Sequence, residues 1–329
     1  MHLTLLVPGL LLPVEILETT AYDLNAPTLS RILGSGERHA LHGDWLPGAF
    51  GLGHLPAAAL RKVGSGGTAP GDWICLDPVR WQVSPEGVML DDPARLELDA
   101  AESSELLAAV QPLFAEWGAL SASAPGRWEL RLNRPLSLET QDLPATIQQP
   151  IDPHLPGGAD GPAWRLLLAE AQTVLHAHPV NRRREEAGRP TVNSLWPWGQ
   201  GCLPDEIQAN FSVVWSNDPM IVGLCRYAGM PCLAPPERFQ PASGPVLALV
   251  ETLAAPVRRL DALAWREALL AVERDWLAPA VQALKRGHST GLRLIGTRLG
   301  SAPESVAWEL KRGDLLRFWR KPRPLTELK

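Results

Sequence analysis

The alternation of apolar and polar positions predicts many short strands and helices. His2–Val7 is almost wholly apolar, which is typical of a buried central strand, and Pro8-Gly9 predicts a turn after it. Residues 26–34 predict a helix that ends at Gly34. From 34 to 71 the chain is rich in Gly, Ala and Pro and shows no strand pattern. There Gly64-Ser-Gly-Gly67 indicates a flexible linker, because it lacks the Lys-Ser/Thr that a phosphate loop requires.

Two helices and one strand stand out in the next part of the chain. Asp99 and Glu102 have the spacing of a capping box, which predicts a helix from Asp99 to Trp117. We expect Asp160 to cap a second helix, over residues 160–176. Arg127–Leu132 alternates between apolar and polar residues like a half-buried strand. Because both helices have an apolar face, we expect them to pack against this strand.

Shorter elements fill the remainder of the chain. The pattern predicts strands at 73–75, 88–90, 191–196, 211–215, 231–234, 246–250 and 291–296, helices at 219–228 and 261–286 (kinked at Pro279), and a closing hairpin of 305–310 with 315–319. Strands that alternate with helices predict an α/β fold with a largely parallel sheet and helices on both faces.

Composition narrows the class of protein. The 329 residues carry a net charge of −5, which argues against a nucleic-acid partner, whose binding surface needs basic residues. The four cysteines form no Cys-x-x-Cys pair, which favours reduced thiols in a cytoplasmic protein. Residues 3–14 are apolar but too short to span a membrane, so no membrane partner is expected. The sequence does not indicate an oligomeric state.

The densest chemistry lies between His178 and Gly201. Three adjacent arginines supply bidentate donors for carboxylate or phosphate, amides can orient a ligand, and glycines permit a close approach of backbone. Pro197 is expected to end the strand at 191–196. The candidate ligand-binding residues are Asn181, Arg184, Asn193, Trp198, Gly199, Gln200 and Gly201. The alternative is that the charges form a solvated helix face and the tryptophans pack in the core.

This stretch resembles the Asn-x-x-Arg-x-x-x-Gly…Asn-x-x-Trp-x-Trp-Gly-x-Gly segment of the archaeal-type, cofactor-independent phosphoglycerate mutases of the alkaline phosphatase superfamily. It looks closer still to bacterial RpfE-type regulatory, phosphoglycerate mutase-like proteins. Further marks of that group, which together cover roughly residues 70–235, are Asp77-Pro78-Val79, Leu155-Pro-Gly-Gly158, Trp164 and Glu170–His176. The resemblance implies an alkaline-phosphatase-like core built from 1–70 plus 190–329, with a smaller α+β substrate-type domain, 71–189, inserted in it.

The resemblance also implies a phospho-serine and two divalent metals held by Asp and His ligands. The chain departs from that pattern. Val7-Pro8-Gly9 stands where the first ligand, an Asp at the end of the first strand, is expected. Gly48–Gly53 contains no serine for the nucleophile, and His288 is the only histidine beyond His178. These residues cannot build the two-metal centre, so no catalytic residue, metal or cofactor is expected.

Other readings stay open. His39, His42, Asp44 and His54 form a weak candidate for a different metal site. The favoured hypothesis is a non-catalytic protein that binds an anionic small molecule or a protein partner in a regulatory role. The first alternative is an active metal-dependent 2,3-bisphosphoglycerate-independent phosphoglycerate mutase or phosphohydrolase that uses Mn, Zn or Mg. The second is an assembly or interaction protein with a tryptophan-rich interface.

Overall fold

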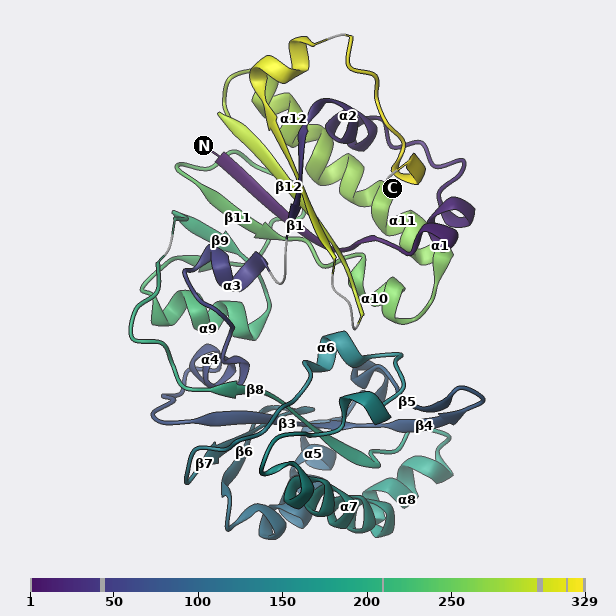
Figure 1. Cartoon of the computed structure of the whole chain (residues 1–329), viewed down its shortest axis with the longest axis vertical. Helices are drawn as coiled ribbons and strands as arrows, with labels where there is room; N and C mark the ends of the chain where they lie inside the picture. The colour runs from purple at the N-terminus through teal and green to yellow at the C-terminus, as the bar shows by residue number, and fades with distance from the viewer. Residues whose placement is uncertain (1, 42–44, 209, 301–303, 318, 328–329) are drawn as a thin grey trace. The chain divides into compact units, whose positions relative to one another are not determined.

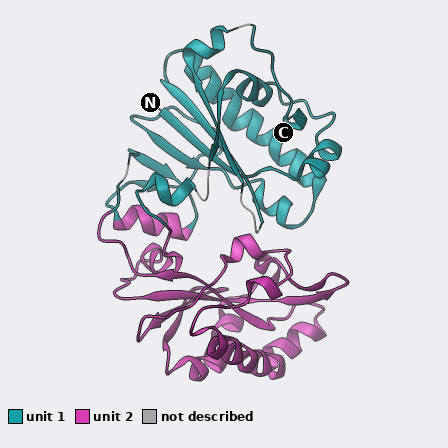
Figure 2. Cartoon of the chain, in the orientation of Figure 1, with its two compact units in different colours: residues 1–53, 207–218, 228–329 teal, residues 54–206, 219–227 magenta. Residues whose placement is uncertain are grey.

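The computed structural model describes residues 2–41, 45–208, 210–300, 304–317 and 319–327. The chain forms two compact units (Figure 2). Unit 1 consists of residues 1–53, 207–218 and 228–329, and unit 2 of residues 54–206 and 219–227. Segments 54–70 and 190–206, which the resemblance assigned to the core, lie in unit 2. The reason is that helix α4 (Ala57–Gly64) packs on the sheet of unit 2 and strand β8 (Ser194–Gly201) belongs to it.

Unit 1 contains a seven-stranded sheet in the order β10-β9-β11-β1-β12-β13-β2 (Figure 1). The strands β10, β9, β11, β1 and β12 are parallel, and β13 is antiparallel to both of its neighbours. The bounds are β1 His2–Leu11, β2 Glu37–Leu41, β9 Val213–Trp215, β10 Cys232–Leu233, β11 Val246–Leu249, β12 Gly291–Arg298 and β13 Ser305–Lys311. The predicted α/β fold with a largely parallel sheet is confirmed.

The helices of unit 1 bury apolar side chains against this sheet. Leu3, Leu5 and Val7 of β1 share one core with Leu29 and Trp265 of the helices, as strand alternation requires. The helices are α1 Val14–Thr20, α2 Pro27–Ser35, α3 Trp45–Ala49, α10 Ala254–Arg258, α11 Ala262–Val272 and α12 Ala278–Lys285. A π-helical turn, Glu273–Leu277, joins α11 to α12, so the predicted long helix is interrupted just before Pro279.

Unit 2 contains a four-stranded antiparallel sheet in the order β6-β7-β3-β8 and a separate hairpin, β4-β5. The strands are β3 Trp73–Val79, β4 Trp81–Ser84, β5 Gly87–Leu90, β6 Gly118–Ala124, β7 Arg127–Leu132 and β8 Ser194–Gly201. The helices are α4 Ala57–Gly64, α5 Ala100–Val110, α6 Leu143–Thr146, α7 Gly161–Ala177, α8 Pro179–Glu186 and α9 Pro219–Tyr227. The central strand β3 is buried along its whole length and has a different apolar core on each face.

The helices expected to pack against Arg127–Leu132 do so. Leu106 of α5, Trp164 of α7 and Trp128 of β7 belong to one core. The capping box of Asp99 and Glu102 is confirmed. Asp160 occupies the N-cap position of α7 as expected, but its side chain makes no capping bond, because its carboxylate accepts bonds from Arg134 and the Ser137 amide instead.

Several local predictions are wrong. Pro8 and Gly9 lie inside β1, where the register shifts, rather than in a turn after it. Pro197 lies inside β8, which an edge strand tolerates since one side of it has no partner to bond. The polar segment Glu37–Leu41 forms edge strand β2, and residues 312–316 form a 3₁₀ turn instead of a hairpin strand. Among the described residues, no helix is long and apolar enough to cross a membrane.

Candidate functional site

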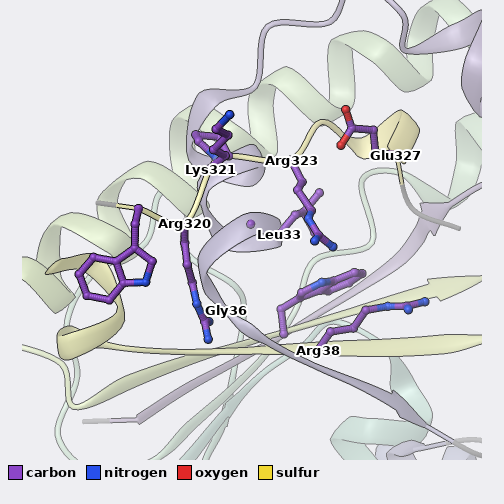
Figure 3. Close-up of a pocket in the computed structure, with 11 residues that line it drawn as sticks. Leu33, Gly36, Arg38, Arg320, Lys321, Arg323 and Glu327 are labelled. Atoms are coloured by element: carbon purple, nitrogen blue, oxygen red, sulfur yellow. The ribbon is translucent and has the colours of Figure 1, made fainter. Parts of the chain in front are cut away.

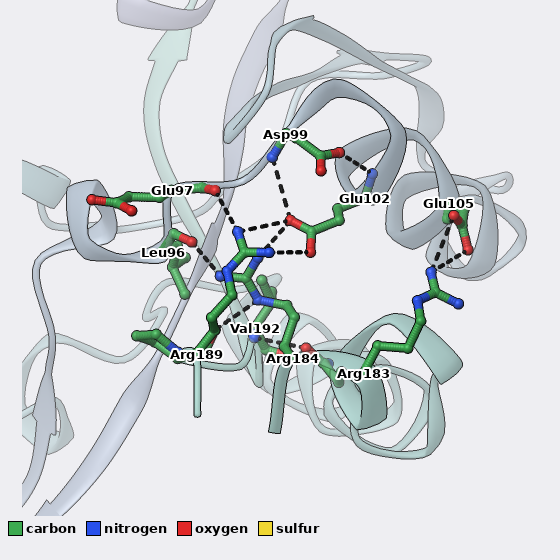
Figure 4. A network of polar contacts seen from close by, with 11 residues as sticks. Leu96, Glu97, Asp99, Glu102, Glu105, Arg183, Arg184, Arg189 and Val192 are labelled. Carbon is green, nitrogen blue, oxygen red and sulfur yellow. Dashed lines mark hydrogen bonds and ion pairs between the residues drawn. The ribbon is translucent and has the colours of Figure 1, made fainter. Parts of the chain in front are cut away.

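Arg184 lies on α8 with its side chain wholly buried inside unit 2 (Figure 4). Its Nη1 donates to Glu102 Oε2 at 2.5 Å, its Nε donates to the Pro190 carbonyl at 2.7 Å, and its Nη2 donates to the Leu96 carbonyl. All three guanidinium nitrogens are therefore bonded to neighbouring segments of the same unit. These bonds hold α8 to α5, to the segment that precedes α5 and to the segment that precedes β8.

Glu102 performs two tasks in this network. It completes the capping box of α5, because its amide donates to Asp99 Oδ1 at 2.8 Å and its carboxylate accepts from the Asp99 amide at 3.3 Å. The same carboxylate receives Arg184 and, at 3.0 Å, Nη1 of Arg189. The neighbouring Arg183 bonds Glu105 in an exposed pair. A helix cap thus provides the counter-charge for a buried arginine.

Asn181 and Asn193 brace the chain before and after the same turn. Asn181 Nδ2 donates to the carbonyls of Leu175 and Val192 at 2.7 and 2.6 Å, and its Oδ1 accepts from the Val192 amide at 2.9 Å. Asn193 Oδ1 accepts from the Trp81 amide at 2.7 Å, and its Nδ2 donates to the Trp81 carbonyl at 2.9 Å. Each side-chain amide thus bonds both the N–H and the carbonyl of one residue, as a neighbouring strand would.

The Trp-Gly-Gln-Gly segment, residues 198–201, is the last part of strand β8 and lies against the start of α4. A Cβ on Gly199, where φ is +60°, would lie 2.5 Å from Ala57 Cβ, so only glycine allows this approach. Gly201, with φ +149°, contacts Pro56 in the same way. Gln200 Nε2 donates to the Leu136 carbonyl at 3.1 Å. The glycines therefore serve the packing of helix on strand.

Trp198 leads to a buried charged cluster that the sequence did not reveal. Its Nε1 donates to Asp77 Oδ2 at 2.9 Å, and Asp77 also receives both Nη atoms of Arg61. Glu129 pairs with Arg61 at 2.8 Å, and all three charged side chains are at most 4% exposed. Burial disfavours the charged form of Arg61, but Asp77 and its other acidic neighbours hold its pKa above the ordinary value.

The charged cluster binds α4 to the sheet of unit 2. Burial raises the pKa of Glu129, although Arg61 and Ser123 oppose that shift. Burial also raises the pKa of the neighbouring Cys75 thiol, which makes it a poor nucleophile. The signal for this cluster in the sequence was one carboxylate, Asp77, in an otherwise apolar strand, since a buried acid needs a partner.

The seven candidate residues are thus together in unit 2, and the polar side chains among them bond to neighbouring segments. Their role in binding a ligand stays a prediction. Their role in bracing is visible in the bonds themselves. Of the alternative interpretation, the packing of the tryptophans in the core is confirmed for Trp196 and Trp198, whereas Arg184 is buried and does not lie on a solvated helix face. Residues with this chemistry serve either purpose, because buried backbone offers the same acceptors as a carboxylate ligand.

A different region bears on the implied metals: the carboxyl end of β1, at the edge of the parallel sheet where ligands of α/β proteins bind. Gly9, with φ +80°, leaves so little room that a Cβ there would lie 3.0 Å from Val257 Cγ2 and 3.1 Å from the Leu253 carbonyl. Trp265 Nε1 donates to the Gly9 carbonyl at 2.8 Å. Leu10 is buried beside them, so apolar side chains fill this position.

The His, Cys, Asp and Glu side chains of the described residues bear on a possible metal site. Within the described ranges, no group of three or more His, Cys, Asp and Glu side chains is placed to hold an ion. In the weak histidine candidate, His39 lies on β2 with its Nε2 3.8 Å from Glu37, whereas His54 belongs to unit 2. His42 and Asp44 lie outside the described residues. None of the four cysteines, which are all among the described residues, forms a disulfide.

Comparisons with known proteins point to one group. A segment of 85 residues is 39% identical to 2,3-bisphosphoglycerate-independent phosphoglycerate mutase of Methanosarcina barkeri, and covers 24% of this chain and 21% of that protein. The enzyme of the same name from Methanosarcina mazei is 36% identical over 102 residues, which are 29% of this chain and 26% of the relative. The chain therefore aligns with about a quarter of these relatives' length. No family model matches it.

Solved structures extend the likeness to the fold. The PH0037 protein from Pyrococcus horikoshii matches 93% of this chain and 86% of its own with a TM-score of 0.51 and 14% identity, which shows a common fold. The cofactor-independent phosphoglycerate mutase from Thermoplasma acidophilum covers 99% of this chain and 93% of its own at a TM-score of 0.46 and 16% identity. The chain is thus an α/β protein with a mostly parallel main sheet. In sequence, about a quarter of it is similar to the phosphoglycerate mutases of the two Methanosarcina species.

Proposed function

We propose that this chain is a non-catalytic phosphoglycerate mutase-like protein that binds an anionic small molecule or a protein partner in a regulatory role. The observation that carries the proposal is the closed carboxyl end of β1. There Gly9, Leu10 and Leu253 occupy the place where the resemblance requires the first metal-binding carboxylate. The carbonyl of Gly9 itself accepts a hydrogen bond from Trp265 Nε1. Apolar side chains offer neither the charge nor the lone pairs that a divalent metal needs.

The replacement of one ligand alone would not abolish a metal centre. At the end of β1, however, the packing around Gly9 also leaves no space for a carboxylate side chain. A carboxylate at position 9 would enter a packed apolar region, and an unpaired buried charge costs several kcal/mol. The order of strands around β1 nevertheless follows an α/β fold that binds ligands at strand ends. The chain keeps this fold but has no carboxylate at the end of β1, and this combination supports binding of a ligand without phosphoryl transfer.

The experiment combines metal content with activity. The purified full chain, equilibrated with Mn²⁺, Zn²⁺ or Mg²⁺ and then freed of unbound metal, is analysed by mass spectrometry of the elements. We expect well below one metal per chain and no interconversion of 3-phosphoglycerate and 2-phosphoglycerate. About two metals per chain together with mutase turnover would contradict the proposal and favour the active enzyme.

A binding assay tests the positive half of the proposal. Thermal unfolding of the full chain is followed with and without phosphorylated and carboxylated metabolites. Because a ligand that binds only the folded state stabilises it by RT ln(1 + [L]/Kd), a ligand at about a hundred times its Kd adds roughly 2.7 kcal/mol. A rise in the melting temperature with one of these anions supports the proposal.

A further inference from the structure

A pocket of about 680 Å³ lies in unit 1 between α2, the start of β2, β13 and the chain segment 319–327 (Figure 3). This volume is within the roughly 300–1,000 Å³ that is usual for small-molecule sites. The pocket belongs neither to the residues between His178 and Gly201 nor to the carboxyl end of β1. It is lined by parts of the chain that are far apart in sequence.

The pocket is basic in a protein that carries net negative charge. Arg38, Arg320, Lys321 and Arg323 line it, against the single acid Glu327. In the part of the chain that the structure describes, the side chains of Arg38 and Arg323 make no hydrogen bond or ion pair, and both are exposed. Their charges are therefore free for an anion, whereas Arg134 and Arg266, for example, form ion pairs with acidic side chains.

The wall that carries these cations is held in place. Arg31 of α2 donates to the carbonyls of Arg320 and Leu315 at 3.4 and 3.0 Å, and the Arg323 amide donates to the Ser30 carbonyl at 2.9 Å. The backbone of Lys321 lies so close to Gly34 that a Cβ on that glycine would be 2.1 Å from the Lys321 carbonyl. Downstream, Leu325 is buried in the core of unit 1. These contacts preform the pocket, so a ligand does not have to order it.

Arginines enter the pocket from two sides. Arg320 and Arg323 extend from segment 319–327 toward β2, which carries Arg38 (Figure 3). Arg320 is oriented by the bond from its Nη1 to the Ser35 carbonyl, at 2.7 Å. Guanidinium groups are planar, always charged and present paired donors, which match the oxygens of a phosphate.

Trp308 adds an unsatisfied donor. It lines the pocket and is fully buried, and its indole N–H has no partner among the described residues. The indole N–H groups of Trp81 and Trp164 also lack a partner among the described residues, but Trp308 is a residue that lines this pocket, so a bound molecule can supply its acceptor. Trp319, 66% exposed, lies on the same pocket and offers an aromatic surface beside the cations.

We propose that this pocket binds a small molecule that carries a phosphate group, with Arg38 and Arg323 as its principal charged contacts. The inference rests on the proposed function and gives its anionic ligand a site. The volume and the concave shape favour a small molecule over an extended acidic peptide. Phosphate is favoured over a carboxylate because it offers more oxygens to guanidinium groups that come from different segments of the chain.

The test uses the full chain with inorganic phosphate and phenyl phosphate as probes, followed by calorimetry and thermal unfolding. We expect phenyl phosphate to bind more tightly than inorganic phosphate, because Trp319 can contact its ring. Arg38→Ala and Arg323→Ala are each expected to weaken binding about tenfold or more, the loss typical of one charge-assisted hydrogen bond. Both residues are exposed, so the variants should unfold at the parent's temperature without probe.

Arg286→Ala is the matched control, because it removes one exposed arginine of the same unit outside the pocket and should leave the affinity unchanged. Equal weakening by all three variants would overturn the inference, since it would show only a general charge effect. Probe binding that no variant affects would overturn this site while leaving the proposed function standing. No response to either probe would overturn the site, and metal-dependent mutase turnover would in addition remove the proposed function. Binding of hexaglutamate at Arg38 and Arg323 without phosphate binding would overturn the ligand class.

Discussion

Arg61 of α4 and Asp77 of β3 meet through two parallel hydrogen bonds, of 2.8 and 2.9 Å, in the interior of unit 2. This bidentate pair anchors a helix to the central strand of a sheet. Asp77 also accepts from Trp198 Nε1 and from the Trp128 amide, so its carboxylate joins three strands and one helix. Among the described residues, Glu129 is the second carboxylate paired with Arg61, but it bonds neither Trp198 nor the Trp128 amide, so it does not duplicate these contacts of Asp77.

We expect Asp77→Asn to lower the free energy of unfolding by about 3–5 kcal/mol, the usual cost of removing one partner of a buried ion pair, because Arg61 loses its bidentate partner and keeps only Glu129 as a counter-charge. Urea unfolding of the parent and the variant measures the loss. Asp152→Asn, which removes an exposed carboxylate of the same unit, serves as the control and should change stability by less than about 0.5 kcal/mol. Similar small effects of both changes would contradict a structural role for the pair.

Glu129 predicts an unusual dependence of stability on pH. Its pKa is raised above 4.5 in the folded protein, so the folded state binds more protons than the unfolded state above that pH, and stability falls as pH rises through the folded pKa. Glu129→Gln removes this dependence. We expect the difference in unfolding free energy, variant minus parent, to become more positive from pH 4 to pH 7. Glu116→Gln, at an exposed position, controls for the change in net charge, and parallel profiles for both variants would rule the effect out.

Arg184→Ala is expected to destabilise unit 2 strongly, by about 3–5 kcal/mol, because Glu102 and the carbonyls of Leu96 and Pro190 lose their shared donor. Its neighbour Arg183 provides the control. Arg183 forms an exposed pair with Glu105, so Arg183→Ala should cost no more than about 1 kcal/mol. Chemical denaturation of the two variants separates the roles of adjacent arginines. An Arg184→Ala protein that is as stable as Arg183→Ala but has lost affinity for an anion would restore the binding interpretation.

Gly9→Ala tests how tightly the carboxyl end of β1 is packed. The left-handed φ costs any other residue roughly 1–2 kcal/mol, and overpacking against Val257 adds about 1–3 kcal/mol. Gly126→Ala isolates the first contribution, because Gly126 has a similar φ of +74° with no atom within 4 Å of the added Cβ. The melting temperature should therefore fall further for Gly9→Ala. Equal shifts for the two variants would mean that the space beside β1 is open.

Most of the correctly predicted elements were predicted from periodic features of the sequence. The capping box of Asp99 and Glu102 and the alternation of Arg127–Leu132 identify their elements, because both depend on residues close together in the chain. Glu37–Leu41 could not be recognised, since an edge strand with polar residues lacks the apolar signal of a buried one. Pro197 misled for a related reason: only the order of strands reveals that β8 is an edge.

The candidate site shows a different limit. Arg184 and Asn181 were identified as chemically important, and the structure gives both several short bonds. Their partners are Glu102 and backbone carbonyls, and no spacing along the chain predicts such partners. Arg38 and Arg323 were not identified at all, because a pocket formed by segments almost three hundred residues apart leaves no local pattern.

The position of β1 determines the order in which the protein can assemble during synthesis. β1 lies between β11 and β12, so both neighbours of the first strand come from the last third of the chain (Figure 1). A ribosome that adds 5–20 residues per second delivers β11 roughly ten to fifty seconds after β1. The four strands of the unit 2 sheet, by contrast, all lie between residues 73 and 201 and can pair before the strands that flank β1 have been synthesised. An apolar strand with two unpaired edges through that interval is a natural target for a chaperone on the nascent chain.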